Sequence, residues 1–395
     1  MNVGWYTQDR TATSTVQFGT KPPFTGNATG VANEWFSGYG FNHFAVLRDL
    51  LPGTRYYYRC GDASGGWSAV YSFVTPPDNT NTPFTIAIYG DMGIVNSQNT
   101  ANGVNSKSLN DEIDWVYHVG DISYADDHVF DFQNTWNTWA GMMENTTSIK
   151  PYMVLPGNHE YTSWDPFLFF ETHNFVVYNH RFMMPGSTSG AQKSMYYSFD
   201  YSNVHFISLS TETSYPDAPF GNDFGDQLSW LEADLAKANQ NRHKRPWIIV
   251  GGHRPIYSSS GGYSDLEGNP TNGNAATLQK TFEDLFMKYG VDAYFTGHVH
   301  SYERNYPAYR GKKVSDYTNP KAPVGIVVGN AGCVEGLTDL DPSKWNNPAP
   351  SWSAFRWGTG WGYGILAVDN LTLKWDFYDA STQSIIDSVT ITKTL

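Results

Sequence analysis

The most informative segment of the sequence is Gly120-Asp121-Ile122-Ser123-Tyr124. It follows residues 113–119, a short apolar run that is typical of a buried strand. The strand is predicted to end in a Gly-Asp turn, which directs the Asp121 carboxylate out of the sheet edge. Tyr124, three residues later, can turn back toward the same point. A carboxylate together with a phenol favours a hard, highly charged metal ion.

Four other stretches repeat this order of strand, glycine and metal-competent side chain. Ligands of open α/β sheets collect beyond the carboxyl ends of the strands. A single Gly-Asp or Gly-His pair is expected by chance in a chain with 37 glycines, and would then be a solvated turn. Five stretches with one order predict a metal site at one sheet edge. The four are residues 84–89 before Gly90-Asp91, 152–155 before Gly157-Asn158-His159, 247–250 before Gly252-His253-Arg254, and 291–296 before Gly297-His298-Val299-His300.

The composition indicates a globular protein with a negative surface. The chain has 395 residues, 40% of them hydrophobic, which predicts one large domain and a smaller one. The net charge of −13 and the lack of a Lys/Arg cluster argue against nucleic acid as a partner. No run approaches the ~20 apolar residues of a membrane span. A phosphate site must therefore create its positive field locally, as metal ions do.

Aromatic and charged residues each make up 16% of the chain, which indicates an extracellular or lumenal protein. Sequons at Asn27, Asn145 and Asn370 permit N-glycosylation and mildly support secretion. The sequence is equally compatible with a Cys60–Cys333 disulfide and with two unpaired buried thiols. The first five residues lack the features of a signal peptide. We expect a secreted or a lysosomal or vacuolar protein.

Residues 1–78 are predicted to form an all-β domain, because short alternating runs lie between Gly- and Pro-containing turns. Residues 50–58 resemble the corner before a late strand of fibronectin type III modules, which normally have seven strands in roughly 100 residues. Only about five strands are recognisable by their alternation. The sandwich is therefore expected to be N-terminally truncated, with Met1 an internal residue or an alternative start. Residues 79–83 are predicted to be a linker.

Residues 84–395 alternate between strands and helices, which predicts an α/β catalytic domain. Helices are expected over 226–239 and 275–289, with Gly290 as the C′ residue of the second. Further strands are expected over 324–328, 363–369 and 371–378, the last two as a hairpin about Asn370. Segments rich in aromatic residues and glycine, 125–149, 256–274 and 333–361, are predicted to be loops that wall the site.

The motif order Gly-Asp, Gly-Asp-x-x-Tyr, Gly-Asn-His-Glu, Gly-His and Gly-His-x-His resembles the purple acid phosphatases within the calcineurin-like metallophosphoesterases. The resemblance extends over nearly the whole chain. Other metallophosphoesterases begin with Asp-x-His, whereas Gly93 takes that histidine position here and Tyr124 supplies the lost coordination. The resemblance implies two mixed β-sheets packed together and flanked by helices. It also implies hydrolysis of phosphomonoesters at acidic pH, by attack of a metal-bound hydroxide on a small phosphorylated substrate.

The resemblance further implies a set of metal ligands with Asp121 as a bridge between two ions. The first site carries three negative charges, which balance Fe³⁺, whereas the second is otherwise neutral and suits Zn²⁺, Fe²⁺ or Mn²⁺. The implied ligands are Asp91, Asp121, Tyr124 and His300 for the first metal, and Asp121, Asn158, His253 and His298 for the second.

The resemblance makes His159 a phosphate contact or a proton donor, and Asn158 a further substrate contact. Arg254 is predicted either to hold a phosphate oxygen or to be an exposed support of the turn. Plant members carry extra histidines about ten residues beyond the His253 position, where this chain reads YSSSGGY over 257–263. The general acid is therefore His159, Tyr257, Tyr263 or water. Supporting roles around the ligands are predicted for Asp126, His118, His205, Glu160 and Glu303.

Two alternative functions use the same sequence features. The same metals would serve a phosphodiesterase or a nucleotide pyrophosphatase with a differently shaped loop. A non-catalytic adhesion protein would account for the fibronectin-like front, but the intact ligand set argues against it. The oligomeric state is left open by the sequence.

Overall fold

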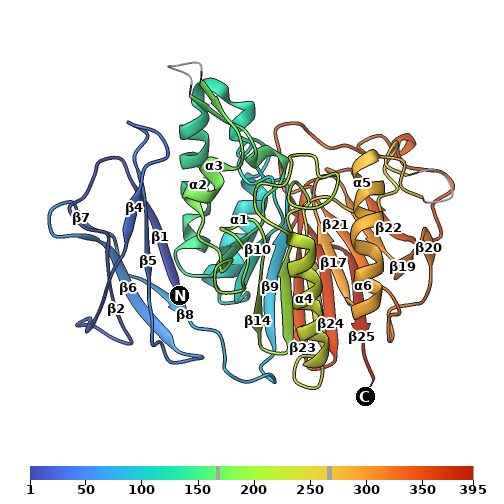
Figure 1. Ribbon diagram of the computed structural model, residues 1–395, viewed down its shortest axis with the longest axis horizontal. Coiled ribbons are helices and arrows are strands. Elements are labelled where there is room, and N and C mark those ends of the chain that lie inside the picture. Colours follow the sequence, from blue (N-terminus) through green and yellow to red (C-terminus); the bar gives the residue numbers. More distant parts are fainter. Residues whose placement is uncertain (166–169, 265–268, 395) are drawn as a thin grey trace.

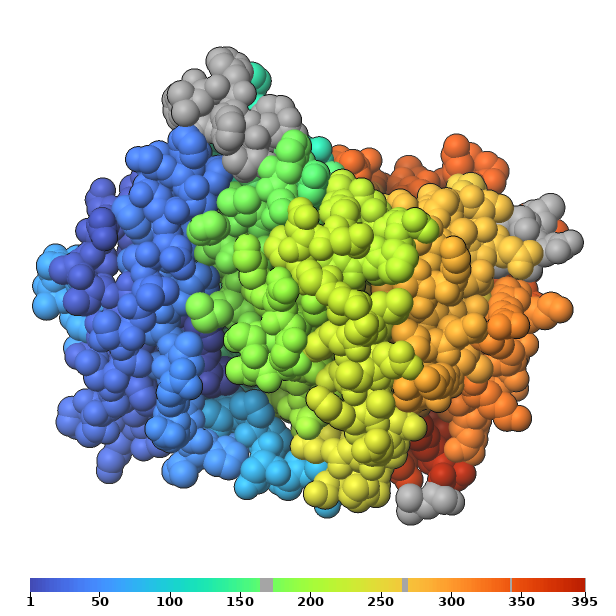
Figure 2. Space-filling view, in the orientation of Figure 1, coloured from blue at the N-terminus to red at the C-terminus, as the bar shows by residue number. Residues whose placement is uncertain are grey.

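An all-β domain lies beside a larger α/β domain in the computed structural model, which describes residues 1–165, 170–264 and 269–394 (Figure 1). The space-filling view shows the N-terminal domain (blue) in direct contact with the segment around α3 (green), Val176–Arg181 (Figure 2). Hydrogen bonds cross this boundary, from Asn2 Nδ2 to the Met183 carbonyl (3.1 Å) and from the Tyr58 hydroxyl to the Ser148 carbonyl (2.7 Å). The two domains are therefore docked through specific contacts.

The N-terminal domain consists of two sheets packed around Val16, Ala45 and Phe73, which confirms the predicted all-β fold. Three short strands escaped the sequence analysis, because the segments GNAT, VAN and GW are too short to alternate. One sheet has the order β1 (Asn2–Thr7), β5 (Phe41–Val46), β4 (Val31–Asn33). The other has the order β3 (Gly26–Thr29), β2 (Thr15–Gly19), β6 (Arg55–Asp62), β7 (Gly66–Trp67), and β8 (Tyr71–Val74) also pairs with β6.

The α/β domain contains two larger sheets, each with parallel and antiparallel pairs, as the resemblance implies. The six-stranded sheet has the order β11 (Tyr152–Val154), β10 (Trp115–His118), β9 (Phe84–Tyr89), β23 (Gly362–Asp369), β24 (Thr372–Asp379), β25 (Ile385–Thr392). The seven-stranded sheet has the order β14 (Tyr197–Tyr201), β15 (Val204–Ser208), β16 (Trp247–Gly251), β17 (Ala293–Thr296), β21 (Val324–Val328), β18 (Tyr302–Asn305), β22 (Ser353–Trp357).

Helices cover the outer faces of the two sheets, so that the central strands are buried on both sides. Trp247 and Ile249 of β16 belong to the core between the sheets, whereas Ile248 and Val250 pack with the helices of the seven-stranded sheet. This explains why β16 is apolar without alternation. The helices are α1 (Gln98–Leu109) and α2 (Phe132–Thr147) on the six-stranded sheet, and α4 (Gln227–Gln240), α5 (Gly273–Leu278) and α6 (Asp284–Tyr289) on the other.

Short elements complete the chain. A π-helical turn, Gln279–Glu283, joins α5 to α6, and Gly290 ends α6 at φ 65°, as predicted. Among the described residues, no helix is both long and apolar enough to cross a membrane. Cys60 and Cys333 are buried free thiols, so the disulfide alternative is wrong. The remaining elements are 3₁₀ turns Ala125–Asp127, Val129–Asp131, Asn158–Glu160 and Pro342–Lys344, and strands β12 (Ser163–Asp165), β13 (Phe170–Thr172), β19 (Ala308–Tyr309) and β20 (Lys312–Lys313).

The prediction of a loop over residues 125–149 is wrong, because α2 occupies most of that segment. Phe132, Trp136, Trp139 and Met143 recur at a helical spacing and are buried. The asparagines and threonines between them resemble a loop in composition, but Asn134 and Thr138 lie exposed on other faces of the helix and Thr135 is buried with the aromatic residues. Part of the predicted loop over 333–361 is a strand, because residues 353–357 form β22. In the predicted loop over 256–274, residues 265–268 lie outside the described residues.

Candidate metal centre

Strand ends from both sheets of the α/β domain meet at one place. Asp91, Asp121 and Asn158 follow β9, β10 and β11 of the six-stranded sheet, whereas His253 and His298 follow β16 and β17 of the other. The prediction of a single sheet edge is therefore wrong in one respect. The two packed sheets present their carboxyl ends on the same side, so the site lies across both.

Several of these side chains leave their strands at backbone positions that non-glycine residues rarely adopt. Asp91 (φ 58°), Asp121 (φ 50°), Tyr124 (φ 56°) and His298 (φ 68°) all have left-handed conformations. Each such residue costs roughly 1–2 kcal/mol relative to an ordinary conformation. The surrounding structure holds all four, and non-glycine residues in such conformations cluster at functional sites.

The glycines of the strand–glycine–ligand pattern make room for the ligands. A Cβ atom on Gly157 would lie 2.1 Å from Oδ1 of Asp121, and one on Gly297 would lie 2.2 Å from Oδ2 of Asp91. Both contacts are far shorter than van der Waals distance. The carboxylates can occupy their positions because the facing backbone has no side chain there.

Four potential ligand atoms surround one point near Tyr124, which is fully buried. Its hydroxyl lies 3.0 Å from Nε2 of His300, 3.3 Å from Oδ1 of Asp91 and 3.5 Å from Oδ2 of Asp121. Around an ion with bonds of about 2.1 Å, neighbouring ligand atoms are separated by about 3–3.4 Å. Nδ1 of His300 lies 3.0 Å from the Gly336 carbonyl, which turns Nε2 toward this point.

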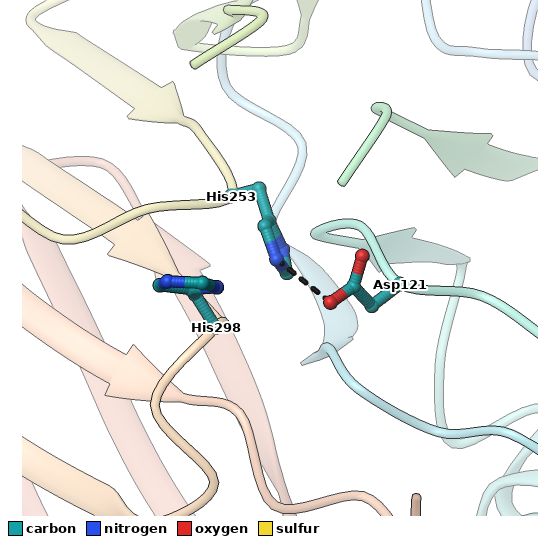
Figure 3. Close-up of side chains that lie close together, drawn as sticks. All are labelled: Asp121, His253 and His298. Carbon is teal, nitrogen blue, oxygen red and sulfur yellow. Dashed lines mark ion pairs between the residues drawn. The ribbon is translucent and has the colours of Figure 1, made fainter. Parts of the chain in front are cut away.

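A second cluster consists of Asp121, His253 and His298 (Figure 3). Nδ1 of His253 donates to the Val119 carbonyl (3.0 Å), so that Nε2 presents its lone pair. Nε2 lies 2.9 Å from Oδ2 of Asp121 but has no hydrogen-bond partner among the described residues. A buried carboxylate oxygen and a buried imidazole nitrogen that lie side by side are suited to share a cation. The donor set therefore fits a metal ion.

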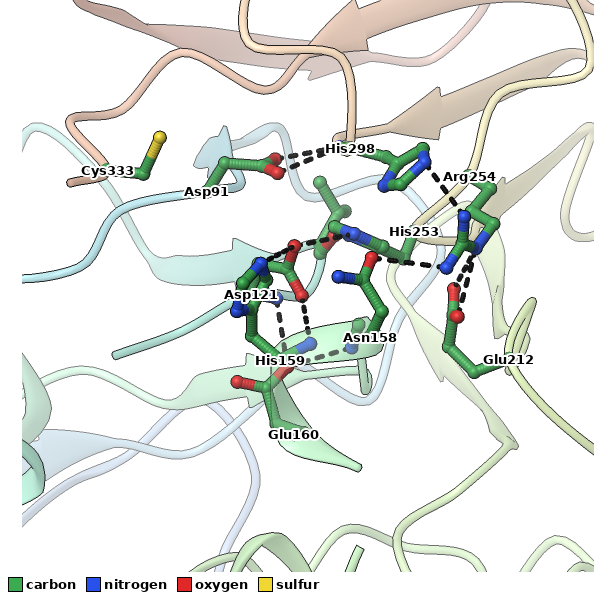
Figure 4. Close-up of polar contacts among 12 residues, drawn as sticks. Asp91, Asp121, Asn158, His159, Glu160, Glu212, His253, Arg254, His298 and Cys333 are labelled. Atoms are coloured by element: carbon green, nitrogen blue, oxygen red, sulfur yellow. Dashed lines mark hydrogen bonds and ion pairs between the residues drawn. The ribbon is translucent and has the colours of Figure 1, made fainter. Parts of the chain in front are cut away.

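Arg254 connects the second cluster to a buried carboxylate (Figure 4). Its Nε donates to both oxygens of Glu212 at 2.9 Å, its Nη1 to Nε2 of His298 at 2.8 Å, and its Nη2 to Oδ1 of Asn158 at 3.3 Å. Arg254 is only 7% exposed, so the alternative of an exposed turn support is wrong. Burial alone would lower the pKa of Arg254, but the Glu212 carboxylate raises it.

His159 lies at the edge of the first cluster, with its ring 4.1 Å from the ring of Tyr124. Its Nδ1 is 2.9 Å from Asp126, and its Nε2 is 4.0 Å from Asp121 and 3.6 Å from Glu335. Burial alone would lower the pKa of His159, but these carboxylates outweigh it and raise the pKa to about 11. Because Asp126 holds Nδ1, an Nε2 proton of His159 is directed toward the ligands.

Glu160 supports the backbone under Asp121, as the sequence analysis predicted. Its carboxylate accepts hydrogen bonds from the backbone N–H groups of Asp121 (2.9 Å), Ile122 (2.8 Å) and Gly157 (2.8 Å). Burial and the charge of Asp121 raise the pKa of Glu160 to about 8. The strained turn at Asp121 is thus fixed to the turn that carries Asn158 and His159.

Other predicted supporting residues lie farther from the ligands. Glu303 accepts from Ser259 and Ser353 and so fixes the segment after Arg254. His118 bonds Tyr152 within the six-stranded sheet, and His205 bridges Asp200 and Asp234 on the opposite sheet. The Tyr257 hydroxyl bonds Glu283 and Gln279, and that of Tyr263 donates to the Pro255 carbonyl. These contacts draw both tyrosines into the protein interior.

Sequence reasoning missed three residues at the centre. Glu212 follows β15 without a glycine, so the motif search passed over it. Sγ of Cys333 is 3.2 Å from Nδ1 of His300, and the Glu335 carboxylate is 3.7 Å from Nε2 of His300. Both belong to a segment expected to be loop, and neither is part of a local pattern. Their positions depend on how that segment returns to the site.

Comparisons with known proteins give a consistent result along the whole chain. Residues 84–302 match the calcineurin-like phosphoesterase family, residues 1–75 the purple acid phosphatase N-terminal domain, and residues 322–388 the iron/zinc purple acid phosphatase-like protein C domain.

Relatives of this chain cover most of its length. Acid phosphatase type 7 of Mus musculus is 38% identical over 371 residues, covering 90% of this chain and 79% of that protein. Purple acid phosphatase 18 of Arabidopsis thaliana is 35% identical over 381 residues, covering 94% and 76%. The structure of purple acid phosphatase PPD1 from seeds of yellow lupin (Lupinus luteus) superposes with a TM-score of 0.80 at 25% identity, over 99% of this chain and 72% of that one.

Proposed function

The chain belongs to the purple acid phosphatases of the calcineurin-like phosphoesterase family, and on that basis we propose which of its residues hydrolyse phosphomonoesters. It is a phosphoric monoester hydrolase with a dinuclear metal centre. The proposal concerns the ligands, the identity of the two ions, and the side chains that contact the substrate.

We assign Asp91, Asp121, Tyr124 and His300 to one ion. The carrying observation is the buried Tyr124 hydroxyl within 3.5 Å of potential ligand atoms of the other three residues. The second ion is assigned to the group of Asp121, His253 and His298, completed by Asn158. Asp121 contributes to both groups, which supports its role as the bridge. The four residues of the second group are brought together by Arg254 and by the His253–Asp121 contact.

The charges of the ligands favour two different ions. Two carboxylates and a phenolate carry three negative charges, which suit Fe³⁺, and the second set suits Zn²⁺, Fe²⁺ or Mn²⁺. Burial raises the pKa of Tyr124, and the charges of Asp91 and Asp121 raise it further, so only a strongly charged ion displaces its proton. When bound, the two ions would act as Lewis acids on the phosphate and would lower the pKa of water, so that hydroxide is available at acidic pH.

Two side chains are proposed to contact the substrate. Arg254 is held by Glu212 through Nε, so its remaining N–H groups are oriented toward the Asn158 and His298 side of the centre. A phosphate oxygen there would receive a charge-assisted hydrogen bond. His159, fixed by Asp126, is positioned to protonate the departing alcohol oxygen from Nε2.

The test of the metal assignment is the visible spectrum of the purified protein with its metal content. A phenolate on Fe³⁺ gives a charge-transfer band, whereas Zn²⁺ and Mg²⁺ give none, so the protein should be pink to purple. Tyr124→Phe keeps the ring and deletes the oxygen, so colour, iron and activity should all fall. Tyr196→Phe removes an equally buried hydroxyl bonded to the Phe224 carbonyl and should change none of them. A colourless, active protein with two divalent ions would exclude Fe³⁺.

Substrate class is tested with p-nitrophenyl phosphate and its bis-ester. Faster hydrolysis of the monoester is expected, and preference for the bis-ester would favour the phosphodiesterase alternative. Loss of turnover with both, in metal-loaded protein, would favour a non-catalytic protein.

We also propose that the chain is glycosylated and acts outside the cytosol, in a secreted, lysosomal or vacuolar location. Asn27, Asn145 and Asn370 are all exposed, which supports their use as acceptors. Residues 1–78 are proposed as one folding unit, because β8 ends at Val74 and β9 begins at Phe84. Mass spectrometry before and after glycosidase treatment would locate the glycans.

A further inference from the structure

A cavity of about 250 Å³ lies between the two domains. Its described lining residues include none of the proposed metal ligands. The N-terminal domain contributes β1 with Trp5 and Tyr6, and the α/β domain contributes α2 and the end of α3. At about 30 Å³ for each molecule of liquid water, the space equals that of about eight waters. It is large enough for a small organic molecule.

Several residues that line this cavity carry buried hydrogen-bond donors without a partner among the described residues. Five N–H groups are of this kind. The described residues that line the cavity include no aspartate or glutamate, although the chain has 38 acidic residues and 25 basic ones. Buried donors are normally paired, and each unpaired one costs free energy. The five groups are Nε1 of Trp5, Trp136 and Trp139, Nδ2 of Asn42, and Nε of Arg181.

Arg181 indicates which kind of ligand the cavity would bind. Its guanidinium lies between the rings of Tyr6 (5.8 Å) and Trp136 (5.2 Å), and its Nη2 donates to Oδ1 of Asn137 (3.2 Å). It forms no ion pair with any carboxylate in the described part of the chain, and burial lowers its pKa to about 9. By contrast, Arg254 forms an ion pair with Glu212, and Arg304 forms one with Asp387. A partly buried arginine with aromatic neighbours and no counter-ion is a receptor for an anion.

We propose that the cavity binds a small organic monocarboxylate with a flat apolar body, whose carboxylate pairs with Arg181. One charge is expected because, among the described residues, Arg181 is the lining side-chain cation without a carboxylate partner. Lys150, which also lines the cavity, pairs with Asp111 (2.6 Å), and the Met1 ammonium donates to the Leu47 carbonyl (3.0 Å). A planar carboxylate matches the two-pronged guanidinium better than a phosphate dianion, which would need a second cation. The apolar body is accommodated by the tryptophans that line the cavity.

Such a ligand would join the two domains, since its contacts come from both. Trp5 and Asn42 lie on β1 and β5 of the N-terminal domain, whereas Trp139 and Arg181 lie on α2 and α3. A compound that binds the docked arrangement alone stabilises it by mass action. Binding should therefore raise the melting temperature of the full chain.

The experiment titrates phenylacetate, as the probe, into the metal-loaded full-length protein by calorimetry. Saturable binding of one molecule per chain is expected. Phenylacetamide has the same shape without the charge and should bind about tenfold to a hundredfold more weakly, the range of a hydrogen-bonded charge. Equal binding of the amide, or no saturable binding of phenylacetate, would overturn the proposal.

Variants locate the site. Arg181→Met should weaken phenylacetate binding by about tenfold or more, and Lys288→Gln, which removes an exposed positive charge on α6, should leave it unchanged. Ala140→Phe keeps Arg181 but fills the cavity from α2, so it should also abolish binding, and it decides the matter if Arg181→Met fails to fold. Unaltered affinity in Ala140→Phe would place the anion elsewhere, for instance at the metal centre, and would refute the proposed cavity.

Discussion

The metal centre and the cavity between the domains both leave buried polar groups without a protein partner, but the groups are of opposite kind. At the metal centre, carboxylate oxygens and imidazole nitrogens lie close together. The cavity has the Arg181 guanidinium in its lining and no carboxylate among its described lining residues. The sign of the imbalance indicates what each site accepts: cations in one, an anion in the other. Variants that change this balance test the comparison.

The largest effect is expected from Asp121→Asn, which removes the carboxylate shared by both groups of ligands. Both ions should be lost, and kcat/KM should fall by more than about 10³-fold, because charge stabilisation at the reacting phosphate disappears. Metal analysis with steady-state kinetics measures both. Asp369→Asn, at an exposed position at the end of β23, is the control. If Asp121→Asn still bound two ions per chain, Asp121 could not be the bridging ligand.

His159→Ala separates metal binding from proton transfer. The ions should stay, because His159 adjoins the ligand Asn158 and contacts Asp126, whereas kcat/KM should fall by about 10²–10⁴-fold. His243→Ala, in an exposed turn, should have wild-type rates. Unchanged kinetics in His159→Ala would leave the residue with a structural role alone.

Gly157→Ala tests whether the space opposite Asp121 is needed. The new Cβ atom would lie 2.1 Å from Oδ1 of Asp121, so the carboxylate or the turn must move, and metal affinity should fall about 10- to 100-fold. Gly141→Ala on α2 meets nothing within 4 Å and should instead raise stability by about 1 kcal/mol. Equilibrium dialysis and thermal unfolding distinguish the two. Normal metal affinity in Gly157→Ala would show that the carboxylate has another position available.

The two arginines, Arg254 and Arg181, give the most direct contrast between the two sites. Arg254→Met leaves Glu212 buried and unpaired, so the free energy of unfolding should fall by about 3–5 kcal/mol. Arg181→Met leaves no carboxylate behind, so the change should be below about 1 kcal/mol. Urea unfolding of both proteins provides the values. Similar losses would mean that Arg181 has a stabilising partner after all, and would weaken the contrast between the two sites.

The sequence allowed the gathering of the candidate ligands to be predicted, because the pattern that carries them is local. Each ligand follows a strand and a glycine within a few residues, and the facing positions of Gly157 and Gly297 explain why that glycine is required. The mixed sheets and the all-β front were also predictable from strand patterns and from the family resemblance. The ligand types alone indicated hard metal ions.

Other features depend on contacts between distant segments and were not predictable. Glu212 and Glu335 reach the centre through packing and loop return, without a motif of their own. Helix α2 was missed because its aromatic stripe is interrupted by asparagine and threonine, which are common in loops. The cavity is lined by Asn42 of one domain and Arg181 of the other, and neither segment has a sequence pattern that predicts the other.

The position of the centre across two sheets also governs when it can form during synthesis. The backbone N–H of His298 bonds Asp91 across 207 residues, and β9 is flanked by β23 from the end of the chain. At about 5–20 residues per second, the ribosome needs roughly 10–40 s to pass from Asp91 to His298. The last strand of the N-terminal domain ends at Val74, so this domain can fold long before that. Until the late strands are synthesised, the carboxylates of Asp91 and Asp121 follow strands of an incomplete sheet. The metal centre can therefore form only near the end of synthesis.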